Sequence, residues 1–257
     1  MKIQNLLKEG QQKLKKTIND SYQLDSEILM SKALHKKRKF ILLNLEKEID
    51  KGKSNIYMNL VNQRSQGKPI AYLIGKKDFW KYEFNVSKDV LIPRPDTELI
   101  IEKILDLTKH KSRLNILDIG VGSGCILLSI LREKPYFNGT GVDLSKKCLD
   151  ISKINALKLG IKNRVKFFKS DIDNFNYGKY DLIISNPPYI NKSKLKYLDK
   201  NVVCYEPIMA LDGGLDGLSE IRKVINKSSE LIKNKGILVL EIAFDQKNKV
   251  KKLLKDR

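Results

Sequence analysis

The sequence predicts an α/β protein in which a helical N-terminal segment precedes an open parallel sheet. Three observations support this. A glycine-rich turn at residues 120–124 joins a strand-like apolar run to a helix-like run, the arrangement of nucleotide-type cradles. Four apolar runs between residues 114 and 185 each end in a polar residue, as expected where parallel strands bind a ligand at their carboxyl ends. Residues 1–75 instead carry apolar residues at helical spacing.

Length and composition are those of a globular protein. The chain has 257 residues, of which 41% are hydrophobic and 31% charged, enough for one large domain or two smaller ones. No apolar run approaches the ~18 residues of a membrane span. Three cysteines without a C-x-x-C pair suggest a reduced, cytoplasmic setting. The two histidines are far apart, so we expect no histidine-based metal site.

The net charge of +20 has two interpretations. It is typical of proteins that act on nucleic acid. However, 42 lysines and only 8 arginines are spread over the whole chain, and arginine is the preferred residue for phosphate and base contacts. A bias in overall composition is therefore the favoured explanation of the charge.

The N-terminal residues 1–75 predict a small helical domain suited to substrate docking. Leu24 to Leu43 carries apolar residues at helical spacing, and Tyr57 to Gln63 predicts a further short helix. Between them, Lys51 to Asn55 is expected to be a break.

Residues 76–95 predict a β-hairpin linker. Asp78 to Val86 is aromatic-rich and alternating. In the following Leu91–Glu98 stretch, two prolines delay any helix until Asp96, which can cap a helix running to about Lys109. Arg94 lies between these prolines, and its spacing does not decide between a surface residue and a site residue.

The glycine-rich turn begins a predicted domain at residues 96–257. The strand Leu114–Ile119 precedes the turn, and the helix Cys125–Leu131 follows it. The Asp118 carboxylate would repel a pyrophosphate; it suits a ligand with an ammonium group, such as the methionine part of S-adenosylmethionine. The candidate cofactor-binding residues here are Asp118, Gly120, Val121, Gly122, Ser123 and Gly124.

Two further strand ends add candidates. The strand Asn138–Val142 ends at Asp143, about twenty residues after the turn, where an acidic residue can accept hydrogen bonds from ribose hydroxyls. The strand Val165–Lys169 is followed by Asp171. Asp171 either accepts from an adenine amine or caps a turn, and turn statistics favour neither reading.

The fourth strand, Asp181–Ser185, ends in Asn186-Pro187-Pro188-Tyr189. The Asn186 side-chain oxygen and the Pro187 carbonyl can both accept hydrogen bonds from one planar NH2 group. Two prolines fix φ and remove backbone donors, so these acceptors stay available. The Tyr189 ring offers a flat face to the same group. We assign Asn186, Pro187 and Tyr189 to catalysis, and Asn186 also to the border of the cofactor site.

Residues 190–217 show little regular structure, and a loop of that length is usually functional. A helix at Leu218–Ile232, a strand at Gly236–Ala243 and a helix at Asp245–Leu254 follow.

The chain resembles the PrmC/HemK family, the protein-glutamine N5-methyltransferases that modify peptide chain release factors. The resemblance rests on the following stretches: Arg64–Tyr72, Phe79-Trp80, Ile92–Glu98, Asp118–Gly124, Asp143, Asn186–Tyr189 and Tyr205-Glu206-Pro207. The Ile-Pro-Arg-Pro-Asp-Thr-Glu stretch is far more specific than the glycine turn.

This resemblance implies a Rossmann-like class I S-adenosylmethionine-dependent methyltransferase domain. It implies methylation of the glutamine in the Gly-Gly-Gln motif of class 1 release factors, with Asn186, Pro187, Pro188, Tyr189, Arg94 and Glu206 at the substrate. Ile172 replaces an aromatic that packs on adenine in the family. The chain also stops before the family's last two edge strands, so we expect five. We expect a monomer that needs neither nucleic acid nor a membrane.

The expected mechanism is in-line methyl transfer to an amide nitrogen held by Asn186 and Pro187. No base of tuned pKa is visible near them in the sequence, and the proton can leave to water after the transfer. Two rival functions remain: an N6-adenine or N2-guanine nucleic-acid methyltransferase, and a non-catalytic binding protein on the same scaffold. The net charge of +20 favours the first rival. The missing edge strands motivate the second.

Overall fold

The computed structural model describes residues 1–17 and 20–256. The chain divides into two compact units, Met1–Gly75 and Lys76–Arg257. Each is described by itself.

The first unit consists of short helices around one apolar core. Its helices are α1 (Ile3–Lys15), α2 (Tyr22–Leu34), α3 (Arg38–Leu43), α4 (Lys51–Ser65) and α5 (Ile70–Ile74). Helices α1, α2 and α4 contribute most of the core, and Tyr57 lies fully buried among their leucines and isoleucines. The Tyr57 hydroxyl is 2.6 Å from the Ser26 hydroxyl, so its polar end has a partner in the core.

One boundary predicted in this unit is wrong, and one stretch of helical spacing divides into two helices. His35 takes a left-handed conformation with φ 51° and ends α2, so the Leu24–Leu43 stretch is two helices. The predicted break at Lys51–Asn55 is instead the first turn of α4. The Asp50 carboxylate accepts a hydrogen bond from the Lys53 N–H at 2.8 Å and caps this helix, which offsets the low helix propensity of Gly52.

The second unit begins with an antiparallel hairpin, β1 (Lys76–Phe79) and β2 (Tyr82–Asn85). The parallel sheet has strands β3 (Asn115–Ile119), β4 (Asn138–Asp143), β5 (Val165–Lys169), β6 (Tyr180–Ser185) and β7 (Ile232–Leu240). Its helices are α6 (Glu98–Leu107), α7 (Cys125–Glu133), α8 (Lys146–Lys158), α9 (Lys200–Tyr205), α10 (Ser219–Leu231) and α11 (Lys247–Lys255).

The strand order β5-β4-β3-β6-β7 is that of a doubly wound sheet. The chain winds outward from β3 to β5, then returns to the other side of β3 with β6. The topological switch point therefore lies between β3 and β6, where such sheets bind ligands beyond the strand ends. The predicted Rossmann-like α/β class is confirmed, with five parallel strands among the described residues.

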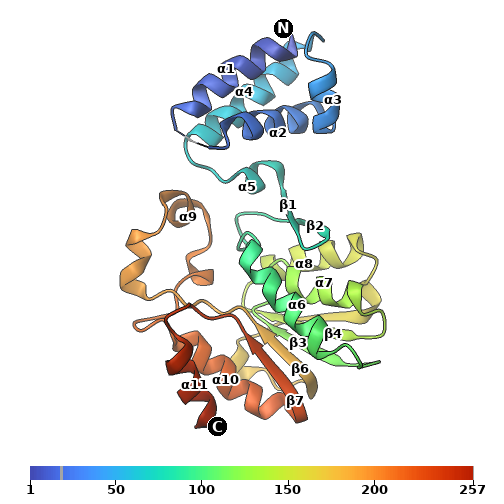
Figure 1. Ribbon diagram of the computed structural model, residues 1–257, viewed down its shortest axis with the longest axis vertical. Helices are drawn as coiled ribbons and strands as arrows, with labels where there is room; N and C mark the ends of the chain where they lie inside the picture. Colours follow the sequence, from blue (N-terminus) through green and yellow to red (C-terminus); the bar gives the residue numbers. More distant parts are fainter. Residues whose placement is uncertain (18–19, 257) are drawn as a thin grey trace. The chain divides into compact units, whose positions relative to one another are not determined.

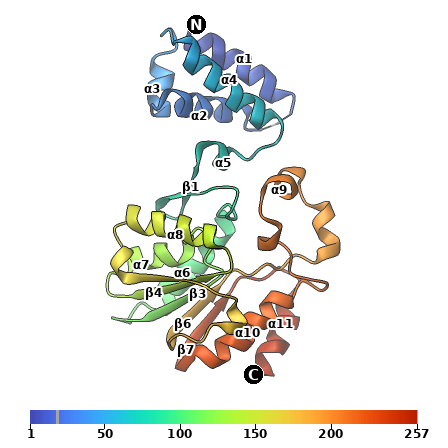
Figure 2. The ribbon, with the colours of Figure 1, turned by 180° about the vertical axis from the view of Figure 1, so that it is seen from behind.

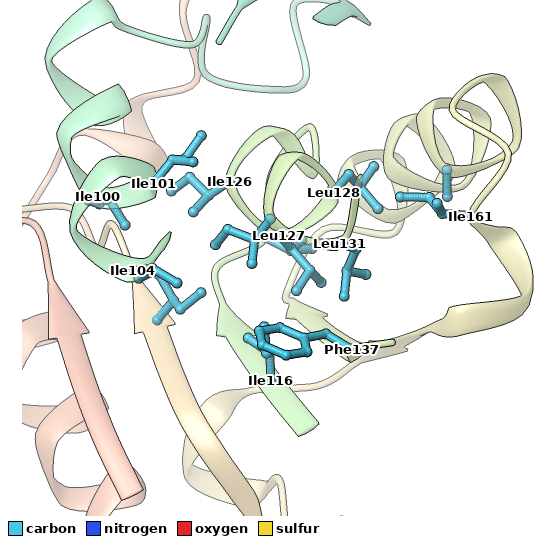
Figure 3. Close-up of a cluster of buried hydrophobic side chains, with 14 of the residues drawn as sticks. Ile100, Ile101, Ile104, Ile116, Ile126, Leu127, Leu128, Leu131, Phe137 and Ile161 are labelled. Carbon is cyan, nitrogen blue, oxygen red and sulfur yellow. The ribbon is translucent and has the colours of Figure 1, made fainter. Parts of the chain in front are cut away.

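Helices cover both faces of this sheet (Figures 1 and 2). Helices α6, α7 and α8 pack on one face, in a cluster that contains Ile104, Leu127 and Leu131 (Figure 3). Phe79 and Phe84 of the hairpin are buried in the same cluster, so the hairpin packs on this unit. Helix α10 covers the opposite face, and α11 packs against α10. Because side chains alternate along β3 and β6, each of these strands serves both cores.

Two predictions in this unit are corrected. Asp96 caps no helix: it lies inside a 3₁₀ turn, Pro95–Thr97, and α6 starts only at Glu98. Residues 190–217 contain α9 and the 3₁₀ turns Lys192–Tyr197 and Ile208–Ala210. Among the described residues, no helix has both the length and the apolar character needed to cross a membrane.

Candidate active site

The turn after β3 leaves an open cradle. Gly120 and Gly122 have φ of +76° and +55°, which only glycine adopts at little cost. A Cβ at Gly120 would meet no atom within 4 Å, and one at Gly122 only the Gly120 carbonyl oxygen at 4.0 Å. By contrast, a Cβ at Gly124 would lie 2.8 Å from Leu128, so this glycine allows close packing with α7. The first two glycines therefore border open space.

Polar side chains hold this turn from behind. The Asp143 carboxylate accepts hydrogen bonds from the Gly122 N–H at 2.9 Å and the Ser145 N–H at 2.8 Å. From α8, the Ser152 hydroxyl donates to the Gly122 carbonyl at 2.8 Å. Each Asp143 oxygen keeps a further acceptor position. Burial raises the pKa of this carboxyl group, so a partner for it is worth more than in water.

Asn155, also on α8, joins the hairpin to the same turn. Its side-chain amide donates to the carbonyl oxygens of Ser123 and Asn85, and its oxygen accepts from the Asn85 N–H at 2.7 Å. The side chain is fully buried, and all of its donors and its acceptor are engaged.

Asp118 is the unsatisfied group of the site. It is 1% exposed, and neither carboxylate oxygen has a hydrogen-bond partner among the described residues. Burial, with a smaller contribution from the negative charge of Asp143, raises the pKa of Asp118 from 3.8 to about 7, although the nearby Leu127 backbone N–H opposes this shift. A buried carboxylate without partners is costly. It marks the position where a cationic group would be bound most favourably.

The residues after β5 form a 3₁₀ turn. The Asp171 carboxylate accepts a hydrogen bond from the Asp173 N–H at 3.1 Å and caps the 3₁₀ turn Ile172–Asn174. Asp171 therefore caps this turn with one carboxylate oxygen, and its other oxygen is left for a ligand. Ile172 is 8% exposed and packs with Ile119, Val142 and Ile183 in a core cluster.

The Asn-Pro-Pro-Tyr turn lies next to the glycine turn. Strands β3 and β6 are paired with Ile119 opposite Ser185, and the Ser185 hydroxyl donates to the Ile119 carbonyl at 2.7 Å. Gly120 and Asn186 therefore leave neighbouring strands at the same level. Asn186 and Tyr189 line a cavity of about 230 Å³, whose further walls are Leu91, Arg94, Ile190, Leu198, Val202, Ala210, Leu211 and Glu241. Most of these walls are apolar, as in small-molecule pockets.

Arg94 lines this cavity, and its side chain is partly exposed. Its guanidinium pairs with Glu206 at 2.6 Å and donates to the Ile92 carbonyl at 3.0 Å. The other Glu206 oxygen accepts from the Ile92 N–H at 3.2 Å. Both oxygens of the buried Glu206 are thus engaged in joining the Ile-Pro-Arg-Pro stretch to the 190–217 segment.

Comparisons with known proteins agree with this geometry. The family described as "PrmC N-terminal domain" matches residues 5–75, and that described as "Methyltransferase small domain" matches residues 95–204. The release factor glutamine methyltransferase of Buchnera aphidicola subsp. Schizaphis graminum is 42% identical over 99% of this chain and 91% of its own. Its counterparts in Buchnera aphidicola subsp. Acyrthosiphon pisum and Clostridium acetobutylicum are 38% and 36% identical, over 99% and 100% of this chain and 90% and 91% of theirs.

The chain belongs to the release factor glutamine methyltransferase family. The resemblance found in the sequence is thereby confirmed.

In this member of the family, two positions near the Asn-Pro-Pro-Tyr turn escaped the sequence analysis. The buried Gln246 donates to the carbonyl oxygens of Tyr189 at 3.0 Å and Gly217 at 2.9 Å. Glu241 follows β7 directly and accepts a hydrogen bond from the Tyr189 hydroxyl at 3.3 Å. Burial raises the pKa of Glu241 above 4.5. A buried carboxyl group with a raised pKa therefore lies beside the Asn-Pro-Pro-Tyr turn, where the sequence shows no such group.

Proposed function

We propose that the chain transfers a methyl group from S-adenosylmethionine to the side-chain nitrogen N5 of the glutamine in the Gly-Gly-Gln motif of class 1 peptide chain release factors. It would act in the cytoplasm, in translation termination. One observation carries this proposal. The glycine cradle with its unpaired Asp118, and the NH2-binding Asn186 turn, leave two neighbouring strands at the same level. A methyl donor and an amide acceptor would meet there.

The residues present fit the methyl donor. Asp118 offers two unpaired buried oxygens for its ammonium group, and Gly120 and Gly122 border open space for its body. Asp143 keeps acceptor positions for ribose hydroxyls, and Asp171 keeps one oxygen for an amine. When bound, S-adenosylmethionine supplies an electrophilic methyl group on a sulfonium.

The chain's own groups prepare the acceptor. An amide nitrogen is a poor nucleophile, because its lone pair is delocalised into the carbonyl. The Asn186 side-chain oxygen and the Pro187 carbonyl accept its two N–H bonds, which orients the nitrogen and favours the positive charge that develops on it. Tyr189 and Pro188 flank the amide, and the apolar cavity walls exclude water from it.

The two parts of the chain have different roles in this proposal. The helical unit docks the release factor, and the sheet-containing unit carries the chemistry. The enzyme acts as a monomer without nucleic acid.

The test is methyl transfer from labelled S-adenosylmethionine. We expect label on a release factor, and none once the glutamine of its Gly-Gly-Gln motif is replaced by alanine. DNA, tRNA and rRNA serve as parallel substrates. Label on adenine or guanine, with an unmodified release factor under matched conditions, would overturn the proposal in favour of the nucleic-acid rival.

A further inference from the structure

The Asn-Pro-Pro-Tyr turn is fixed by what lies at its two ends. Pro187 and Pro188 have no N–H group, so neither can donate a hydrogen bond that would hold the turn from within. Upstream, the Ser185 carbonyl accepts a hydrogen bond from the Glu241 N–H at 3.0 Å, which ties the turn to the sheet. The position of the Pro187 carbonyl therefore depends also on what holds the downstream end, at Tyr189.

A loop before α10 packs its backbone directly on that downstream end. A Cβ at Gly213 would be 2.9 Å from the Pro188 carbonyl oxygen, and a Cβ at Gly217 would be 2.6 Å from the Tyr189 carbonyl oxygen. Only glycine lets two backbones approach so closely. The Gly213 N–H also donates to the Ile190 carbonyl at 2.8 Å. The loop and the turn therefore form one packed unit.

A single side chain joins this unit to the start of α11. The Gln246 NH2 group donates to the Tyr189 carbonyl at 3.0 Å and to the Gly217 carbonyl at 2.9 Å. The Gln246 side-chain oxygen accepts from the Ala243 N–H at 3.0 Å. Because Gln246 is 6% exposed, water does not compete for these hydrogen bonds, and each is stronger than at the surface.

The partners of Gln246 allow only one orientation of its amide. The Ala243 N–H can only donate a hydrogen bond, and the Tyr189 and Gly217 carbonyls can only accept one. The NH2 group must therefore face the two carbonyls, and the oxygen must face Ala243. A side chain without two donors cannot replace Gln246 between these carbonyl oxygens, which would otherwise oppose each other.

We propose that Gln246 is a positioning residue for the methyl transfer. By holding the Tyr189 carbonyl, it sets the Pro187 carbonyl and the Tyr189 ring at the positions from which they act on the acceptor amide. The inference rests on the proposed function, in which these two groups contact that amide. It adds a determinant that lies 57 residues after Tyr189 in the chain, beyond β7.

Asn155 provides a matched comparison on the other side of the site. Like Gln246, it is buried, donates two hydrogen bonds from its side-chain amide and accepts one. Asn155 holds the glycine turn, whereas Gln246 holds the Asn-Pro-Pro-Tyr turn. Gln246→Met and Asn155→Leu each remove three hydrogen bonds with little change in volume. The two variants should therefore lower the free energy of unfolding by comparable amounts.

The two variants should differ in function. Gln246→Met should lower kcat about ten- to a hundredfold, the scale of a misplaced reacting group, and leave the affinity for S-adenosylmethionine largely unchanged. Asn155→Leu should instead act mainly on that affinity, measured by calorimetry. Both are assayed at a temperature at which urea unfolding shows each variant to be folded. A purely structural role for Gln246 predicts a loss of stability with an unchanged kcat.

Gln246→Glu tests the two donors themselves, and it decides the question if Gln246→Met does not fold. Glutamate has the same size and keeps an acceptor for the Ala243 N–H. When ionised, it places a negative oxygen against the Tyr189 and Gly217 carbonyls; when protonated, it can donate to one of them. The ratio of its kcat to that of the wild type should be low at pH 8 and should rise as the pH falls.

The ionisable groups on the elements around position 246 occur in both enzymes, so their titration cancels in this ratio. They are Asp245 with its partner Lys194, Asp216 with its partner Arg222, the α11 residues Lys247 and Lys249, and Glu241 with Tyr189. We would measure kcat at saturating S-adenosylmethionine, because kcat reports the groups that titrate in the complex.

Two results would overturn the inference: a folded Gln246→Met enzyme with wild-type kcat, or a Gln246→Glu enzyme with wild-type kcat at pH 8. The proposed function fails separately, if the wild type leaves the release factor unlabelled. The same variants would then be measured on whatever NH2 group is labelled, because the Pro187 carbonyl would accept from that group in the same way. An enzyme that labels nothing ends both proposals.

Discussion

Asp118→Asn should make the ligand-free protein more stable at neutral pH while abolishing most of its affinity for S-adenosylmethionine. The wild-type side chain is 1% exposed and has no hydrogen-bond partner for either oxygen among the described residues. Its negative charge is therefore a cost to folding that only a cationic ligand offsets. Asparagine keeps the shape and removes the charge.

The magnitude follows from the pKa of Asp118, which is raised from 3.8 to about 7. A raised pKa means that the folded state holds its proton when the unfolded state has lost it. The stabilisation from this proton is complete below pH 3.8 and is lost as the pH rises to about 7. At about 1.4 kcal/mol per pKa unit, the loss is about 4 kcal/mol of unfolding free energy. The unpaired asparagine itself costs roughly 1–3 kcal/mol at every pH, which leaves a net gain of about 1–3 kcal/mol at pH 8.

The assay is urea unfolding of both proteins between pH 4 and pH 8, with and without S-adenosylmethionine. The unfolding free energy of Asp118→Asn, relative to that of the wild type, should rise by about 4 kcal/mol from pH 4 to pH 8. Asp106→Asn controls for removing a charge from a chain of net charge +20, because the Asp106 side chain is 73% exposed. A difference that stays constant with pH would refute the reasoning, as would a variant that gains as much stability from S-adenosylmethionine as the wild type does.

Asn186→Ala should leave cofactor binding largely intact and cut the methyl-transfer rate at least about a hundredfold, the scale for removing a transition-state hydrogen-bond partner. A loss of S-adenosylmethionine affinity as large as the loss of rate, measured by calorimetry, would contradict the role of Asn186 at the amide. Asp143→Ala should weaken donor binding by roughly 1.5–3 kcal/mol, through lost hydrogen bonds to a charged acceptor, and unchanged calorimetric affinity would remove Asp143 from the cofactor site. Gly122→Val should abolish donor binding by filling the cradle. Gly160→Val is the control, because Gly160 has a similar φ of +68° and equally open surroundings at the far end of α8. It should lower stability by a comparable amount and still bind S-adenosylmethionine. Equal binding of S-adenosylmethionine by both variants would count against the cradle.

Elements defined by short-range signals were predictable from the sequence. The glycine turn, the hairpin and the parallel strands follow from local patterns of apolar, glycine and proline residues. The helix boundaries in the first unit were not, because they depend on single capping residues. Asp50 starts α4 at a point where Gly52 argues against a helix, and His35 stops α2 without any glycine or proline.

The supports of the site were also hidden in the sequence. Asn155 and Ser152 lie on a helix whose pattern gives no sign of function. Yet they bind the turn from 30 or more residues away, because Ser152 and Gly122 are separated by 30 positions and Asn155 and Ser123 by 32. Such pairs are created by the crossover of α8 over the sheet. The pattern that predicts the helix carries no information about its distant partners.

Glu241 shows how a small boundary error hides a residue at the carboxyl edge of the sheet. In the sequence, the candidate residues are those that follow each parallel strand, and the fifth strand is predicted to run to Ala243. In the structure β7 ends at Leu240, so Glu241 stands where Asn186 stands after β6. The Glu241 N–H also donates to the Ser185 carbonyl at 3.0 Å, which ties the two strand ends together. A strand that ends three residues earlier thus brings a carboxylate to the carboxyl edge of the sheet, beside the Asn-Pro-Pro-Tyr turn.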